Sequence, residues 1–388
     1  MMLLQIAVLV SWALATNALN TSLTLPDLLG PSLVGTVSFE LIDHSRLDPY
    51  APTSQPRDLM ISVFYPVKHV RRYKLAPAYT TSYGAYLDTS SGLPAGTAAS
   101  TISKAYQGAY LHTENNKLPP ILFYSSGYGN SRVDYTGTLS NLASQGYLVI
   151  AVDHPYDANF VDYPDGRNAT RYENTLDPDK VETIAPALDI RVQDIQFVLN
   201  TLSTNSTIAR QIPGIHGKLN DRKVGMFGHS FGGAATAATM LIDQRFACGV
   251  NMDGSIFGSV LDSGLAKPYL FIDIGADHNR TTDDSWSTLW SKLRGWKAEL
   301  SFSGSSHSAF SDQIILYEQL KKMGVIPDLG DIYGAIAGER LKVLEHAYLT
   351  SFFGKCFGKG RGGLLNGPSE KFPEVVVWED GSGARPFR

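Results

Sequence analysis

Residues 223–233 read Lys-Val-Gly-Met-Phe-Gly-His-Ser-Phe-Gly-Gly, and the alanine-rich run 234–238 follows directly. The apolar start of this stretch is typical of a buried strand, and its small-residue continuation favours a helix. A Gly-x-Ser-x-Gly element between a strand and a helix places the serine hydroxyl on a sharp turn above a sheet. Gly228 and Gly232 leave room for neighbouring backbone to pass. The stretch therefore predicts that Ser230 is a nucleophile.

Outward from this turn, short apolar runs alternate with helical stretches. Such alternation predicts an α/β fold in which helices cover both faces of a mostly parallel central sheet. Together with the serine turn, it indicates the α/β-hydrolase fold. The expected strands are 59–65, 121–124, 147–152, 223–227, 248–252, 269–274 and 297–302. The expected helices are 135–144, 181–202 (with Pro186 marking a kink or a late start), 231–241, 285–293, 312–322 and 335–353.

A serine hydroxyl needs a base, and this fold supplies nucleophile, acid and histidine in that order along the chain. Three histidines follow Ser230. His346 falls within a helical pattern, and His278 follows the strand 269–274. His307 lies in a small-residue loop after the last strand, where an imidazole can reach over the nucleophile. We therefore predict that His307 is the base.

Two carboxylates are candidates for the acid that orients the imidazole. Asp253 ends the strand that follows the Ser230 helix, and Asp277 ends the next strand. Sequence spacing does not choose between them, because either could stabilise the imidazolium. The oxyanion formed by attack on an ester requires backbone N–H donors. We expect these at Phe231 and, from the loop 125–130, at Tyr128.

The chain also resembles the plasma-type platelet-activating-factor acetylhydrolase family. The matching segments, in order, are 57–66, Ser-Gly-Tyr-Gly at 126–129, Asp-His at 153–154, Gly-His-Ser-Phe-Gly-Gly at 228–233, Met-Asp-Gly at 252–254 and 304–312. The resemblance implies a triad of Ser230, Asp253 and His307, and oxyanion donors at Tyr128 and Phe231. The chain departs from the family at Ser126, where family members usually carry histidine, which bears on the shape of the oxyanion loop.

The resemblance further implies release of short sn-2 acyl groups, acetyl above all, from phospholipids without calcium or another cofactor. The substrate would be a lipid or small-molecule ester, met in part at a lipid surface. Two alternatives remain open: a general short-chain carboxylesterase or polyester hydrolase, and a hydrolase-fold binding module without activity. Loss of the serine or the base is typical of the second class, and both are present here.

The first residues predict export. An apolar stretch followed by small residues is typical of a signal peptide, here residues 1–18. Residues 19–388 would then form one catalytic domain, with an irregular excursion at 79–108 and a loosely held tail at 358–388. Asn20, Asn168, Asn205 and Asn279 begin Asn-x-Ser/Thr acceptor triplets, as in a secreted glycoprotein. Cys248 and Cys356 could pair or stay free.

Composition argues against nucleic acid as a partner, and one apolar helical stripe has two possible interpretations. The net charge of −4, with basic residues scattered along the chain, does not favour nucleic acid. Neither cysteine has metal-ligand spacing, so no metal is expected. Trp286, Leu289, Trp290 and Leu293 form a helical stripe that packs on the sheet or, alternatively, faces lipid. The sequence does not predict the oligomeric state.

Overall fold

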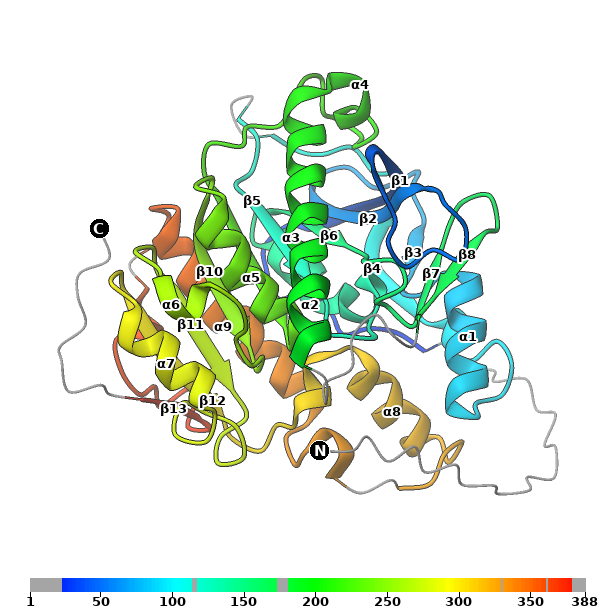
Figure 1. Cartoon of the computed structure of the whole chain (residues 1–388). Helices are drawn as coiled ribbons and strands as arrows, with labels where there is room; N and C mark the ends of the chain where they lie inside the picture. Colours follow the sequence, from blue (N-terminus) through cyan, green and yellow to red (C-terminus); the bar gives the residue numbers. More distant parts are fainter. Residues whose placement is uncertain (1–22, 114–116, 173–180, 329–330, 361, 379–388) are drawn as a thin grey trace.

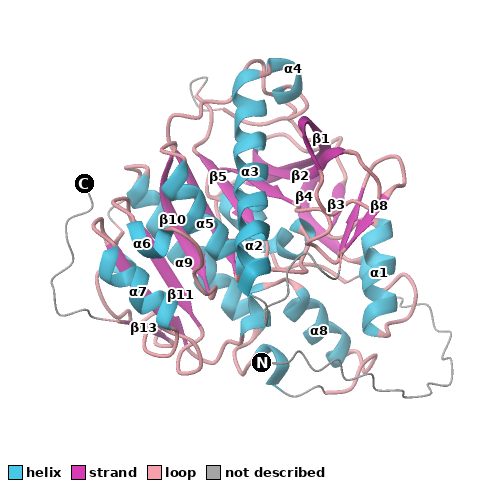
Figure 2. Cartoon of the chain, viewed as in Figure 1, coloured by secondary structure: helices cyan, strands magenta, loops and turns pink. Residues whose placement is uncertain are grey.

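A central sheet of eleven strands runs through the protein, and helices cover both of its faces (Figures 1 and 2). This computed structural model describes residues 23–113, 117–172, 181–328, 331–360 and 362–378. The predicted signal peptide, including Asn20, lies outside the described residues. The predicted α/β architecture, with a mostly parallel core and helices on both faces, is confirmed.

Six parallel strands form the core of the sheet and fix the position of the site. In spatial order these are β12 (Lys297–Phe302), β11 (Tyr269–Asp273), β10 (Phe246–Met252), β9 (Val224–His229) and β5 (Ile121–Ser125), with β6 (Leu148–Val152) pairing parallel to β5. Each was predicted from its apolar run. Because their carboxyl ends share one edge, the loops that follow β5, β9, β10, β11 and β12 converge there.

Side chains that alternate along each strand divide the interior into two apolar cores. On β5, Ile121 and Phe123 belong to one core, and Leu122 and Tyr124 belong to the other. Successive strand side chains point to opposite faces, so each core lies on one face of the sheet. Helices α3 (Val181–Thr204), α5 (Phe231–Ile242), α6 (Val260–Ser263) and α7 (Asp284–Lys292) cover the first core, and α2 (Thr136–Ser144), α8 (Gln313–Lys322) and α9 (Gly338–Cys356) cover the second. Pro186 lies inside α3, so the late start is wrong.

The N-terminal part of the sheet is larger than predicted. Strand β1 (Leu33–Leu47) forms an antiparallel hairpin with β2 (Pro56–Val67), and β2 pairs antiparallel with β6. Residues 79–108, expected to be irregular, contain helix α1 (Thr81–Ser91) and strand β4 (Ile102–Gln107). Strand β4 pairs with β1 and with β3 (Leu75–Pro77). The small polar residues of this region suggested a loop. Strand β4 forms because its backbone pairs with the edge of β1, a contact that composition does not reveal.

The C-terminal tail was also misjudged. Strand β13 (Val375–Val377) pairs antiparallel with β12, and Phe372 and Val375 are buried. The described part of the tail, to residue 378, is therefore packed on the domain, because its apolar residues have a place on the sheet edge. Cys248 and Cys356 form a disulfide that ties β10 to the end of α9.

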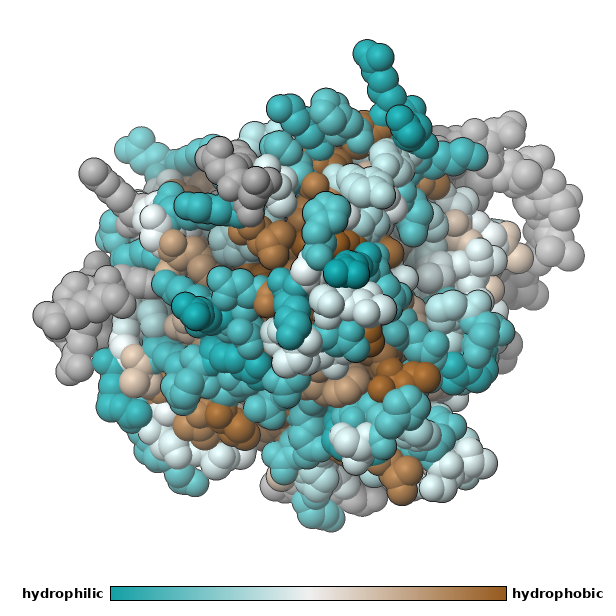
Figure 3. Space-filling model, turned by 90° about the horizontal axis from the view of Figure 1, so that it is seen from above, coloured by the Kyte–Doolittle hydropathy of each residue, from teal (hydrophilic) through white to brown (hydrophobic). Residues whose placement is uncertain are grey.

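Two properties of the surface bear on membranes. In the part of the chain that the structure describes, no helix has the length and apolar character to cross a bilayer. On the face seen from above, apolar side chains form separate patches among hydrophilic ones (Figure 3).

A second sheet has only two strands, β7 (Phe160–Asp162) and β8 (Asn168–Thr170).

Candidate active site

Ser230 occupies the sharp turn between β9 and α5. Its backbone has φ 55° and ψ −124°, a conformation that non-glycine residues rarely adopt. The turn also demands glycine on both sides. A Cβ at Gly232 would lie 1.9 Å from the Ser125 carbonyl oxygen, and one at Gly228 would lie 2.2 Å from the Gly232 carbonyl oxygen. The motif therefore holds the serine in a strained turn packed against the end of β5.

Asp253 lies in a second strained turn, directly after β10, with φ 59°. The Asn251 side chain holds this turn, because it donates to the Gly254 carbonyl and accepts from the Gly254 N–H. The turn also touches the serine turn, since a Cβ at Gly254 would lie 1.9 Å from the Ser230 carbonyl oxygen. Ser230 and Asp253 are thus held close together by backbone packing.

The loop after β12 brings His307 to the same place. His307 Nδ1 lies 2.5 Å from Asp253 Oδ2, while half of the His307 side chain stays exposed. Its ring centroid is 4.6 Å from that of His229, the residue before Ser230. Among the described residues the Ser230 hydroxyl forms no hydrogen bond with His307. Such contacts are often long in ligand-free enzymes and tighten when substrate binds.

His229 forms a neutral support behind this pair. Its Nδ1 lies 2.8 Å from the Tyr135 hydroxyl, so its side chain is directed toward Tyr135. Burial lowers the pKa of His229 well below its usual value, and the charge of His307 lowers it further. His229 is therefore uncharged at neutral pH.

Asp253 has a second imidazole partner that the sequence did not reveal. His278 Nδ1 lies 2.6 Å from Asp253 Oδ1, and His278 Nε2 lies 2.8 Å from Asp283 Oδ2. His278 was considered only as a rival base. Its two ring nitrogens both face carboxylates, so it has no nitrogen directed at Ser230. Asp277, the rival acid, is exposed to solvent.

The loop after β5 lies against the serine turn, as the oxyanion prediction requires. A Cβ at Gly127 would lie 3.3 Å from the Ser230 Cβ. Ser126 is buried and donates from its hydroxyl to the Asn130 carbonyl across 2.9 Å. A short internal hydrogen bond thus closes the loop that carries Tyr128. Phe231 begins α5, where backbone N–H groups lack helical partners.

Arg191, on α3, supports both predicted oxyanion donors. Its guanidinium donates to the carbonyls of Ser126, at 2.5 Å, and Gly127, at 3.4 Å. The Gly127 carbonyl belongs to the same peptide unit as the Tyr128 N–H. The guanidinium carbon also lies 4.7 Å from the centre of the Phe231 ring. A bidentate ion pair with Asp157 balances its buried charge. Sequence reasoning missed Arg191, since one arginine in an amphipathic helix resembles a solvent-facing residue.

The apolar stripe on α7 that the sequence predicted packs against the turn that carries Asp253. Trp286 and Leu289 are fully buried, and Trp286 Nε1 donates to the Gly254 carbonyl across 2.7 Å. The packing interpretation of this stripe is therefore confirmed, and the lipid-facing alternative is wrong. The buried indole thereby also adds a hydrogen bond to the turn that carries Asp253.

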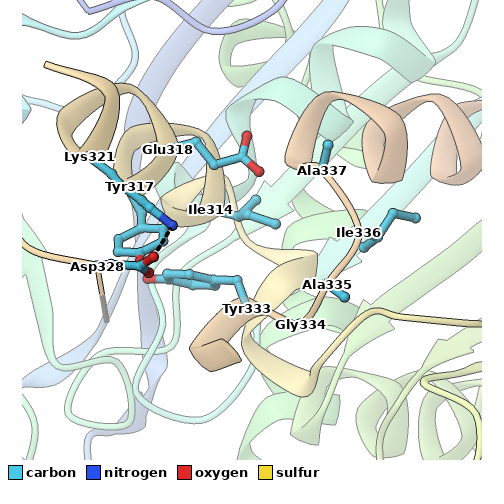
Figure 4. A pocket seen from close by; sticks show the side chains of 10 residues that line it. All are labelled: Ile314, Tyr317, Glu318, Lys321, Asp328, Tyr333, Gly334, Ala335, Ile336 and Ala337. Carbon is cyan, nitrogen blue, oxygen red and sulfur yellow. Dashed lines mark hydrogen bonds and ion pairs between the residues drawn. The ribbon is translucent and has the colours of Figure 1, made fainter. Parts of the chain in front are cut away.

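A cavity of about 380 Å³ lies beside the His307 loop, between α8 and the start of α9 (Figure 4). Figure 4 shows Tyr317 and Tyr333 close together, with Lys321 paired to Asp328 at the rim. Ser306 Oγ donates to the Ile332 carbonyl, which attaches the His307 loop to this wall. Ser230, Asp253 and His307 do not line this cavity, so we do not assign it to substrate binding.

Comparison with known proteins assigns the family. Residues 20–326 match the model of the family described as "Platelet-activating factor acetylhydrolase, isoform II". The chain belongs to this family. The predicted resemblance is therefore confirmed over most of the sequence, and with it the classes of fold and enzyme: an α/β-hydrolase that cleaves carboxylic esters.

Individual relatives of this acetylhydrolase-family chain include both fungal and animal proteins. A protein of Arthroderma benhamiae named "Probable 1-alkyl-2-acetylglycerophosphocholine esterase" is 36% identical, covering 94% of this chain and 97% of its own. The platelet-activating factor acetylhydrolase of Cavia porcellus is 25% identical over 66% of this chain and 63% of its own. A solved ferulic acid esterase from Streptomyces cinnamoneus matches 92% of this chain and all of its own, at 28% identity and a TM-score of 0.78.

Proposed function

We propose that the protein hydrolyses the short sn-2 acyl ester, acetyl above all, of ether phospholipids such as platelet-activating factor. Ser230 is the nucleophile, His307 the base and Asp253 the acid. The observation that carries the chemistry is the His307–Asp253 hydrogen bond beside the strained serine turn. The Arthroderma benhamiae relative, similar along nearly its whole length, supports the choice of substrate.

The proposed reaction has two steps that use the same groups. His307 accepts the Ser230 proton as Oγ attacks the ester carbonyl, and Asp253 stabilises the resulting imidazolium. The N–H groups of Phe231 and Tyr128 stabilise the oxyanion, and His307 returns the proton to the departing alcohol. Water, activated by His307, then releases the acyl group from Ser230. Each oxyanion donor typically lowers the barrier by about 3 kcal/mol.

A matched ester panel tests the substrate class. We expect kcat/KM for a 2-acetyl ether phospholipid to exceed that for its 2-palmitoyl counterpart by at least about 100-fold, a ratio that a closed acyl pocket can supply. The measurement is acyl release from dispersed lipid at matched headgroup. Because the Streptomyces neighbour is named a ferulic acid esterase, methyl ferulate and p-nitrophenyl acetate are included. Higher turnover of ferulate than of acetyl phospholipid would favour the general carboxylesterase instead.

We propose further that the protein is exported and glycosylated. The disulfide suits an oxidising compartment. Asn168 and Asn205 are exposed, so each side chain has room for an N-linked glycan. Asn279 differs: it is 2% exposed, and its Nδ2 donates to the Gly275 carbonyl across 2.7 Å. We therefore propose that Asn279, unlike Asn168 and Asn205, carries no glycan in the folded protein.

Glycopeptide mapping of protein secreted from a fungal host tests this distinction. We expect glycan on peptides containing Asn168 and Asn205, and unmodified amide at Asn279, because a glycan there would break a buried hydrogen bond. Deamidation by a glycosidase in heavy-oxygen water marks each occupied site. Substantial occupancy at Asn279 would contradict the structure of this loop.

A further inference from the structure

Four side chains near the serine form one continuous hydrogen-bonded chain. Asp283, at the N-terminus of α7, contacts His278, which contacts Asp253, which contacts His307. Each carboxylate–imidazole distance in this chain is between 2.5 and 2.8 Å. The proposed acid is therefore shared by two imidazoles, of which His307 is the proposed base.

Hydrogen-bond chemistry sets the charge of His278. An ionised carboxylate only accepts hydrogen bonds, so an imidazole placed between two carboxylates donates from both nitrogens and carries a positive charge. Asp283 is ionised, since it also accepts from Ser255 Oγ and from the Ser285 N–H and hydroxyl. Burial alone would lower the pKa of His278, but its bonds to Asp253 and Asp283 outweigh burial and raise that pKa to about 10.

None of the titratable groups described around this chain supplies a second positive charge in contact with Asp253. The titratable groups nearest the chain, from β11, β12, β9 and the loops, are Asp273, Asp277, Arg280, Glu299 and His229. Burial raises the pKa of Asp273 to about 8, so it is largely protonated at neutral pH. Arg280 is paired with Glu299, His229 is neutral, and Asp277 points into solvent. His278 is thus the cation in direct contact with Asp253.

We propose that His278 is a positioning residue whose fixed positive charge, held by Asp283, holds Asp253 in place and opposes a second positive charge on His307. The physical reason is competition for one carboxylate. Charge on His278 partly neutralises Asp253 and repels a second cation at His307, so loss of that charge in a variant should favour the protonated form of His307. This inference rests on the proposed triad and adds to it a determinant of the working pH.

Two substitutions separate the charge from the hydrogen bonds. In His278→Asn, the amide N–H can still donate to Asp253 from the place of Nδ1, but the charge is gone. In Asp283→Asn, the side-chain oxygen can still cap α7 at Ser285 and Trp286, since asparagine is a good N-cap, while the carboxylate that holds the charge is lost. The His278 side chain is partly exposed, at 20%, so its replacement leaves the core intact.

The test is the pH dependence of kcat/KM for p-nitrophenyl acetate, whose acid limb reports the base of the free enzyme. We expect the acid limb to move upward by about one pH unit in His278→Asn and in the same direction in Asp283→Asn. Histidine ¹⁵N NMR of the Ser230→Ala protein should also show a doubly protonated His278 at pH 7. An unmoved limb in both variants, or a neutral His278, would overturn the inference. Because the NMR readout needs no turnover, it stands apart from the proposed function.

Discussion

Ser230→Ala should reduce hydrolysis of acetyl esters by about 10⁴-fold or more, because removal of a triad nucleophile leaves only binding and oxyanion stabilisation. Fold and stability should persist. The Ser230 hydroxyl does not cap its own helix, and alanine meets the same backbone strain as serine at φ 55°. The readouts are initial rates on p-nitrophenyl acetate and on acetyl phospholipid, together with the thermal unfolding midpoint.

A second serine-to-alanine variant serves as a control for the loss of a hydroxyl at a different position. Ser287 lies on the exposed side of α7, so Ser287→Ala removes a hydroxyl far from the turn and should leave the rates within about twofold. A fluorophosphonate probe should label the wild type and Ser287→Ala but not Ser230→Ala. Labelling or turnover that survives in Ser230→Ala would remove the serine mechanism. An unlabelled, inactive wild type would instead favour the binding-module alternative.

Local sequence was enough to predict the serine turn and the parallel strands. Gly-x-Ser-x-Gly carries its own geometric demands, and a strand buried on both faces is an uninterrupted apolar run. Strand β1 lacked that signal, because its more exposed face carries polar residues such as Ser38 and Glu40. Its place follows only from pairing with β2, a contact that composition does not encode.

The contacts around Asp253 could not be predicted from the sequence for a similar reason. That His278 faces Asp253 depends on the parallel register of β10 and β11, which pairs Met252 with Ile272 and so aligns the two following loops. Arg191 reaches the oxyanion loop from the buried side of an amphipathic helix. Side chains contributed across strands are set by register and helix packing, and a single sequence contains no direct record of either.

Asp253→Asn should lower kcat by about 10³–10⁴-fold, the second large effect, because the variant removes the charge that orients His307 and stabilises its imidazolium. An asparagine of the same size can present its N–H₂ to one of the two imidazoles, which favours the wrong tautomer of His307. Asp253 is also 1% exposed and accepts from two imidazoles, so the variant should unfold at a lower temperature as well. Steady-state kinetics and thermal unfolding measure the two effects.

Asp277→Asn is the matched control, since Asp277 ends the neighbouring strand loop, next to His278, but faces solvent. Its rates should stay within about twofold of the wild type. The two variants together decide which carboxylate is the acid, a choice that sequence spacing left open. If Asp277→Asn lost activity while Asp253→Asn kept it, His307 would have to change its partner during turnover. The 2.5 Å bond to Asp253, in a turn fixed by Asn251 and Trp286, opposes such a change.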